Sequence, residues 1–191
     1  MSQLPSIAII IGSTRPGRVG ASVGQWVFEE ASSREDAAFT LVDLADFGLG
    51  LLNEATSPGA ANRAYENPAT RVWSQEIDKY DGYVFVTPEY NHGVPAAFKN
   101  ALDLLYPEWN DKTVAFVGYG ADGGVRSIEH WRTIVANVRL HATRAQLSLS
   151  LFTDFEAGRF TPSERRAGEL EGVLNQLLPL TVALRGMREG H

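Results

Sequence analysis

The residues best suited to binding a charged ligand occur in the stretch GSTRPGR at positions 12–18, which lies between an apolar segment and a helical pattern. Ser13 carries a hydroxyl group that can donate a hydrogen bond, and Arg15 and Arg18 carry guanidinium groups suited to phosphate oxygens. Gly20 lets the backbone come close to a ligand, and the start of the following helix favours an anion. The stretch therefore predicts a site for one terminal phosphate group, against the alternative of a surface turn with two solvated arginines.

Two larger phosphate-binding motifs nearly match this stretch, and each fails at one decisive residue. In the P-loop pattern, Val19 stands where a hydroxyl would bind magnesium and Arg18 replaces the lysine, which argues against magnesium-dependent nucleotide hydrolysis. In the dinucleotide fingerprint, Thr14 stands where a glycine would allow close approach to a pyrophosphate. A single phosphate remains the ligand that this loop suits.

Buried strands and amphipathic helices must position this loop. Short, mainly apolar segments predict strands at 7–11, 39–44, 82–88 and 113–119, and alternation of apolar and polar residues predicts a fifth strand at 145–151. Apolar residues at helical spacing predict helices that alternate with them, at 19–27, 69–80, 94–105, 128–138 and 170–178. This alternation predicts a three-layer α/β sandwich with a parallel sheet, formed by a single domain over residues 1–191.

Two features interrupt the regular pattern. Residues 46–68 contain Gly, Pro, Asn and Ser without a clear period, which predicts a long irregular connection of a functional or mobile kind. Pro179 falls inside the last helical stripe and is expected to kink or end that helix.

Two more loops of unusual composition follow predicted strands. The third strand runs into TPEYNHGVP, and the fourth runs into GYGADGG. Ligands of such sheets bind beyond the carboxyl ends of the strands, near the topological switch point. The three loops are therefore expected to lie together in space and to form the binding site.

The composition narrows the class of protein. The chain has 191 residues and a net charge of −6, with scattered Lys and Arg, which argues against nucleic-acid binding. It has no cysteine, and its four histidines show no metal-ligand spacing, so no metal site is expected. No apolar run reaches the length of a membrane span and no secretory signal is visible, so we expect a cytoplasmic location and no membrane partner.

The pair GSTRPGR and TPEYNHGVPAAFKNALD resembles the NADPH-dependent FMN reductase family, whose members are flavodoxin-like proteins related to azo-, quinone- and chromate-reducing enzymes. The resemblance implies a sheet of order 2-1-3-4-5 with helices on both faces and FMN at its C-terminal edge. It implies that the FMN phosphate is bound by Ser13, Arg15, Arg18 and the backbone near Gly20. It also implies that the isoalloxazine ring is surrounded by Pro88, Glu89, Tyr90, Asn91, Gly118, Gly120 and Gly123, with Gly118 in place of a serine that the family often has.

The activity implied by this resemblance is that of an FMN-dependent oxidoreductase. It would take electrons from NADPH or NADH and pass them, by ping-pong hydride transfer, to a small acceptor such as a quinone, an azo compound, a metal oxyanion or a flavin. The cofactor carries this chemistry, so no catalytic side chain is assigned. Glu89 is expected to have a structural or subunit-bridging role, because a carboxylate beside the flavin would oppose its reduction. His92 is expected to be a loop or solvent contact rather than a proton donor to a quinone.

Two alternative functions stay open: a flavodoxin-like electron carrier, and a reductase that supplies free reduced FMN to a monooxygenase partner. The family usually forms dimers or dimers of dimers, which implies a homo-oligomer. Residues 46–68 are the segment expected to reach a second subunit.

Overall fold

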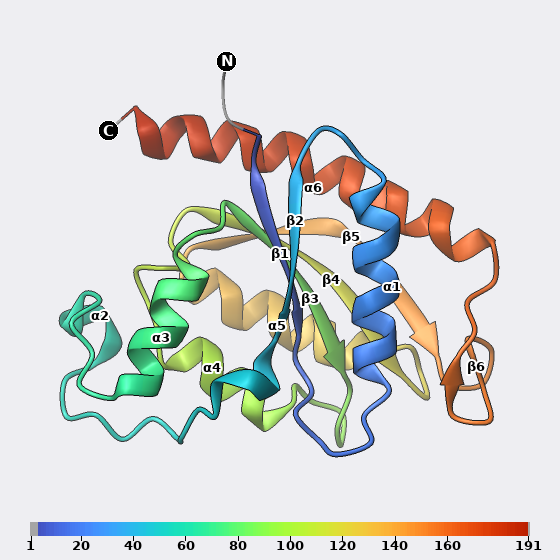
Figure 1. Cartoon of the computed structure of the whole chain (residues 1–191), viewed down its shortest axis with the longest axis horizontal. Helices are drawn as coiled ribbons and strands as arrows, with labels where there is room; N and C mark the ends of the chain where they lie inside the picture. Colours follow the sequence, from blue (N-terminus) through green and yellow to red (C-terminus); the bar gives the residue numbers. More distant parts are fainter. Residues whose placement is uncertain (1–3, 191) are drawn as a thin grey trace.

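The computed structural model describes residues 4–190 and contains a five-stranded parallel sheet of order β2-β1-β3-β4-β5 (Figure 1). Its strands are β1 (Ser6–Ile11), β2 (Ala38–Asp43), β3 (Gly82–Pro88), β4 (Lys112–Gly120) and β5 (Leu140–Ser150). The helices are α1 (Gly20–Ser32), the 3-10 helix η1 (Leu44–Phe47), α2 (Pro58–Ala61), α3 (Pro68–Ile77), α4 (Ala96–Asp103), α5 (Val125–Asn137) and α6 (Arg165–Glu189). A small antiparallel hairpin joins β6 (Phe155–Glu156) and β7 (Arg159–Phe160). The predicted sandwich and strand order are confirmed.

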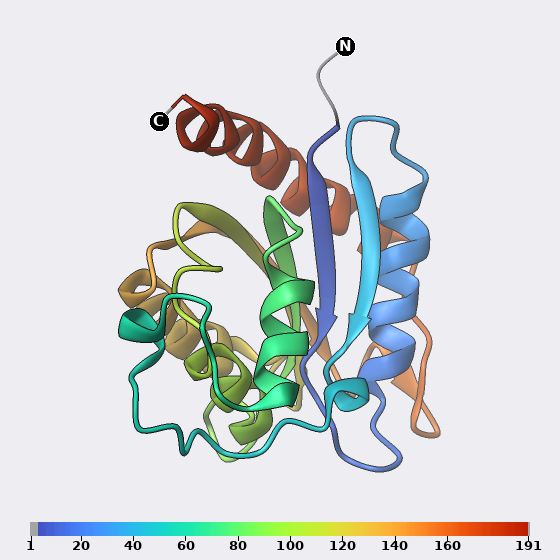
Figure 2. The same ribbon diagram turned by 60° about the vertical axis from the view of Figure 1, so that its left-hand side comes forward.

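Alternate residues of the strands pack against helices on opposite faces of the sheet. Ile7 and Ile9 of β1 belong to one apolar cluster, which also contains residues of α1 and α6. Ala8 and Ile10 belong to the other cluster, which contains residues of α3, α4 and α5. Figure 2 shows the sheet between these two groups of helices. The period-two alternation thus makes both faces of a parallel sheet apolar, and both are covered.

The last helix does not end at the proline inside it. α6 passes Pro179 and continues to Glu189, so of the two outcomes expected at this proline, a kink or an end, the end does not occur. Contacts with the sheet anchor the helix beyond the proline. The hydroxyl of Thr181 lies 2.6 Å from that of Thr113 in β4, and Arg188 donates to a carboxylate oxygen of Asp81 at 2.7 Å. These contacts stabilise the helix despite the amide that proline lacks.

Other differences from the predicted elements concern short or irregular segments. Residues 46–68 contain part of η1 and all of α2, neither of which has a periodic signal in the sequence. β5 begins five residues earlier than predicted, because the pairing with β4 shifts register between Val114 and Phe116 and breaks the alternation. The β6–β7 hairpin turns at Ala157 and Gly158, both with positive φ. Within residues 4–190, no helix is long and apolar enough to span a membrane.

The carboxyl ends of the parallel strands all lie at one edge of the sheet, at the lower side of Figure 1. The loop from β1 to α1 and the loop from β3 to α4 meet at this edge, beside β1, where the order of the strands reverses. The fold therefore brings the sequence-predicted loops to the place where such sheets bind ligands.

Candidate functional site

A pocket of about 190 Å³ opens at this edge and brings the three loops together. Three of its lining residues come from the loop after β1, three from the end of β3, two from the end of β4 and one from the segment after β5. They are Arg15, Arg18, Val19, Pro88, Glu89, Tyr90, Tyr119, Gly120 and Leu151. The predicted convergence of the loops is thus present in the structure.

Arg15 and Arg18 both line the pocket, but their surroundings differ. Arg18 forms an ion pair with Asp43 at the end of β2, and the two side chains are 20% and 21% exposed. The buried Nε of Arg18 has no hydrogen-bond partner. Arg15 is exposed, and among the described residues its side chain has neither an ion pair nor a hydrogen bond. One guanidinium is therefore fixed at the site, and the other is free to close over a ligand.

Two hydroxyl groups meet beside these arginines. Ser13 is 1% exposed, and its Oγ lies 2.8 Å from the hydroxyl of Tyr90, so these two groups satisfy each other. The hydroxyl of Tyr119 is buried and has no hydrogen-bond partner. Burial, with a contribution from Tyr90, raises the pKa of Tyr119, although Ser13, Arg18 and Arg15 act in the opposite direction. Tyr119 is therefore a neutral hydrogen-bond donor near neutral pH.

The carboxylate of Glu89, a lining residue of the pocket, is held by Arg126. Its side chain is 9% exposed and accepts hydrogen bonds from the backbone amide of Arg126 at 3.0 Å and from its guanidinium at 2.8 Å. The same guanidinium donates to Asp122 at 2.6 Å. Glu89 thus ties the end of β3 to the start of α5, which agrees with the structural role expected for it.

The remaining predicted residues lie near the pocket without lining it. Gly118 is inside β4, where a Cβ would lie 2.7 Å from Ile128, so close packing accounts for the glycine at this position. Gly123 adopts a positive φ of 70° in the turn before α5. Asn91 and His92 form an exposed turn with φ values of 50° and 64°.

The site has the properties that a phosphate group requires. Two of its residues, Arg18 and Tyr119, carry buried donor atoms without partners, and an unmade hydrogen bond of this kind destabilises a protein. Gly20 begins α1, whose first turn has neither a capping side chain nor an acidic residue, so its amides and dipole favour an anion. A cationic donor set at a helix start fits the phosphate of FMN, and the apolar surfaces of Val19, Pro88 and Leu151 fit less polar parts of the same molecule.

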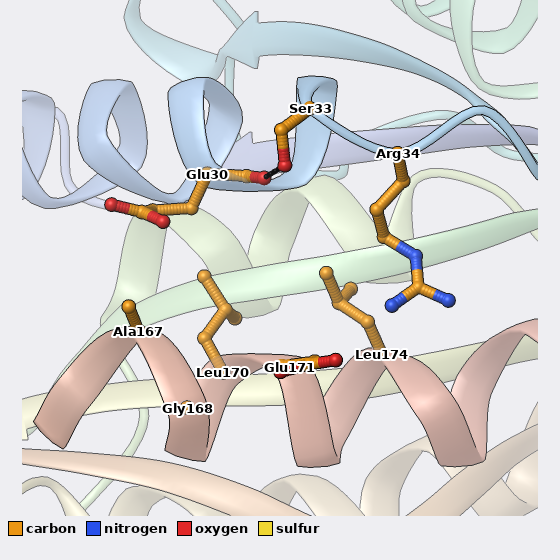
Figure 3. A pocket seen from close by; sticks show the side chains of 8 residues that line it. All are labelled: Glu30, Ser33, Arg34, Ala167, Gly168, Leu170, Glu171 and Leu174. Carbon is orange, nitrogen blue, oxygen red and sulfur yellow. Dashed lines mark hydrogen bonds between the residues drawn. The ribbon is translucent and has the colours of Figure 1, made fainter.

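A second pocket, of about 310 Å³, lies between the end of α1 and the first half of α6 (Figure 3). Its lining includes Glu30, Arg34 and Glu171 and none of the predicted site residues. Arg34 already donates to Asp36 at 2.9 and 2.6 Å and to Asn175 at 2.9 Å. This pocket lies at the far end of α1 from the three loops, and its lining side chains have no buried donor atom without a partner.

Several residues that shape the site had weak signals in the sequence. Tyr119 stands between two glycines at the end of a predicted strand, and no motif assigns it a role. Asp43 and Arg126 carry no motif, because their importance comes from the partners they meet, 25 and 37 residues away in the chain. Leu151 follows β5 and enters the pocket through the arrangement of the sheet.

Comparisons with known proteins identify the family of this chain. Residues 5–154 match the family described as NADPH-dependent FMN reductase. An NAD(P)H-dependent FMN reductase of Schizosaccharomyces pombe is 35% identical over 150 residues, covering 78% of this chain and 75% of that protein. A quinone reductase of Pseudomonas putida is 33% identical over 139 residues, covering 66% of this chain and 70% of that protein.

A solved structure extends the likeness to the whole fold. The flavoenzyme NAD(P)H:(acceptor) oxidoreductase FerB of Paracoccus denitrificans superposes with a TM-score of 0.74 at 19% identity, covering 94% of this chain and 98% of that one. At this identity the likeness concerns the fold, whereas the sequence matches establish the family. The resemblance predicted from the two motifs is confirmed: the chain belongs to the NADPH-dependent FMN reductase family and is an oxidoreductase that uses FMN with NAD(P)H as the electron donor.

Proposed function

We propose that this chain transfers electrons from NAD(P)H to a small acceptor (a quinone, an azo compound, a metal oxyanion or a flavin) in a ping-pong cycle. FMN supplies the hydride chemistry when it is bound. The observation that carries the proposal is the pocket itself, where Arg15, Arg18 and Tyr119 lie near the start of α1 and the last two have buried donor atoms without partners. The names of the curated relatives, an FMN reductase and a quinone reductase, support flavins and quinones among these acceptors.

The residues divide between two ends of the proposed FMN site. At the phosphate end we propose Ser13, Arg15, Arg18 and Gly20. At the ring end we propose Pro88, Glu89, Tyr90, Asn91, Gly118, Gly120 and Gly123, chiefly through backbone groups and apolar surface. The carboxylate of Glu89 is occupied by Arg126 and supplies no proton. The chain thus binds and orients its ligands, and among the lining residues no other carboxylate and no histidine is placed to act as an acid or base.

A binding and reduction experiment tests the function. The purified protein should bind FMN, and the visible absorbance of the flavin should bleach anaerobically with NADH or NADPH and return on addition of an acceptor. A ping-pong cycle gives parallel double-reciprocal plots, and intersecting plots would contradict it. Protein that binds no FMN would refute the function. FMN that neither nucleotide reduces would indicate an electron carrier, and FMN released during gel filtration would indicate a supplier of free reduced flavin.

We further propose that the chain forms homodimers or dimers of dimers, with residues 46–68 at the contact. Leu51 and Leu52 in this segment are 78% and 40% exposed, which is unfavourable in water and favourable at an interface. The segment is held in place, because Asn100 of α4 donates to the carbonyl of Gly50 and accepts from the amide of Leu52, both at 2.9 Å. A monomeric mass by light scattering at micromolar concentration would contradict this proposal. The cytoplasmic location stays a prediction.

A further inference from the structure

Tyr119 has a hydroxyl group that makes no hydrogen bond in the flavin-free protein. The residue is 5% exposed, extends from the end of β4 and packs among the apolar side chains that face α1 and α6. Its Oη is buried without a hydrogen-bond partner, whereas the neighbouring hydroxyls of Ser13 and Tyr90 bond to each other. A phenylalanine would fill the same space without burying an unpartnered hydroxyl, so packing does not explain the hydroxyl and a bound ligand would.

Gly20 determines where this hydroxyl lies. A Cβ at Gly20 would be only 2.2 Å from Oη of Tyr119 and 3.1 Å from its Cζ, so any other residue would push the ring away. Gly20 is the first residue of α1, and its backbone does not occupy the left-handed region, so space and not conformation requires the glycine. The missing side chain therefore lets the Tyr119 hydroxyl reach the start of α1, where the helix amides have no partners.

We propose that Tyr119 is a phosphate-binding residue, whose hydroxyl donates a hydrogen bond to the FMN phosphate at the start of α1 and so selects FMN over flavins that lack the phosphate. This inference rests on the proposed FMN site. It adds to the arginines of the loop after β1 a donor from a different strand, since Tyr119 belongs to β4. The hydroxyl replaces a capping side chain, which α1 lacks because its N-cap residue is Val19.

The electrostatics of the site agree with this role. The pKa of Tyr119 is raised, so the phenol keeps its proton and can donate to a dianion. Arg15 and Arg18 are close enough to influence its titration, so the three donors share one neighbourhood. The Tyr119 oxygen is covered in the free protein, and Tyr90 and Arg15 are the exposed side chains beside it that can move aside for the ligand.

The test compares dissociation constants of FMN and riboflavin for the wild type, Tyr119→Phe and a control, Tyr106→Phe. Tyr106 lies outside the pocket, and its hydroxyl makes only a 3.4 Å contact with a backbone carbonyl. Loss of a hydrogen bond to a charged group should weaken FMN binding about tenfold to a hundredfold in Tyr119→Phe. Riboflavin binding should change less than about twofold. The melting temperature of the flavin-free variant should not fall, because the removed hydroxyl has no partner there.

A second variant separates the role of the hydroxyl from that of the ring. Gly20→Ala should weaken FMN binding by displacing the hydroxyl, and it should weaken binding much less when Tyr119→Phe is already present, because the 2.2 Å conflict is with the oxygen. Additive losses would overturn the inference. So would a loss of FMN affinity below about threefold in Tyr119→Phe, or an equal loss for riboflavin. If the wild type itself binds FMN no more tightly than riboflavin, the proposed phosphate site fails rather than Tyr119 alone.

Discussion

Replacing Arg18 with alanine should weaken FMN binding more than replacing Arg15 does. Arg18 is already ordered by its ion pair with Asp43, so binding costs it little side-chain entropy. Arg15 is exposed and without an ion pair among the described residues, so it loses rotamer freedom of up to about 2 kcal/mol when it binds. A charge-assisted hydrogen bond is worth about 1.5–3 kcal/mol, so loss of all this freedom leaves at most about 1 kcal/mol, or about fivefold in Kd, for Arg15.

For Arg18 the loss should be about 2–3 kcal/mol, or about thirtyfold to a hundredfold in Kd. Repulsion adds to this loss of affinity, because Arg18→Ala leaves the negative Asp43 carboxylate without its cation beside the phosphate. The double variant Arg18→Ala/Asp43→Asn should therefore bind FMN more tightly than Arg18→Ala alone.

Titration of the flavin-free proteins with FMN, followed by flavin fluorescence, measures these constants, and riboflavin serves as the control ligand without a phosphate. The losses should shrink as the salt concentration rises, because ions screen the charges. The reasoning is refuted if Arg15→Ala weakens FMN binding as much as Arg18→Ala, if removal of Asp43 restores nothing, or if riboflavin is weakened equally.

Three further predictions concern stability. Glu108→Ala should lower the free energy of unfolding by about 3 kcal/mol or more, since two buried hydroxyls that donate to this fully buried carboxylate at 2.9 and 2.6 Å lose their acceptor. The melting temperature should fall by about 6 °C or more in thermal unfolding. An unchanged melting temperature would contradict this prediction. Burial lowers the pKa of Lys112 to about 8, so the unfolded chain binds more protons between this value and the ordinary 10.5. The stability of the wild type relative to Lys112→Met should therefore rise between pH 8 and 10, by up to about 3 kcal/mol, and urea unfolding that gives a constant difference would disprove this. Gly12→Ala should destabilise the fold by about 1–3 kcal/mol, because its Cβ would lie 1.9 Å from the Phe98 ring, whereas the control Gly50→Ala, with open space around it, should change little in the same assay.

Most of the fold could be predicted because its signals are local. The strands of the sheet show apolar runs or apolar–polar alternation and each long helix has an apolar stripe, so their order along the chain predicts a parallel sheet with covered faces. The errors occur where distant contacts override local preference. α6 continues through Pro179 because Thr181 and Arg188 are anchored on the sheet, and β5 is long because its register against β4 shifts.

The candidate site divides in the same way. The sequence by itself determined that three loops of unusual composition lie at one edge of a parallel sheet and that the first of them suits a single phosphate. Only the tertiary structure decided which groups remain available there. Arg18 is paired with Asp43, Ser13 with Tyr90 and Glu89 with Arg126, across 25, 77 and 37 residues of sequence, while the hydroxyl of Tyr119 has no partner. The physical reason is that hydrogen bonds and ion pairs form only over a few ångströms. Strand register and helix packing therefore determine which residues become partners, and neither can be read from the local pattern of residues.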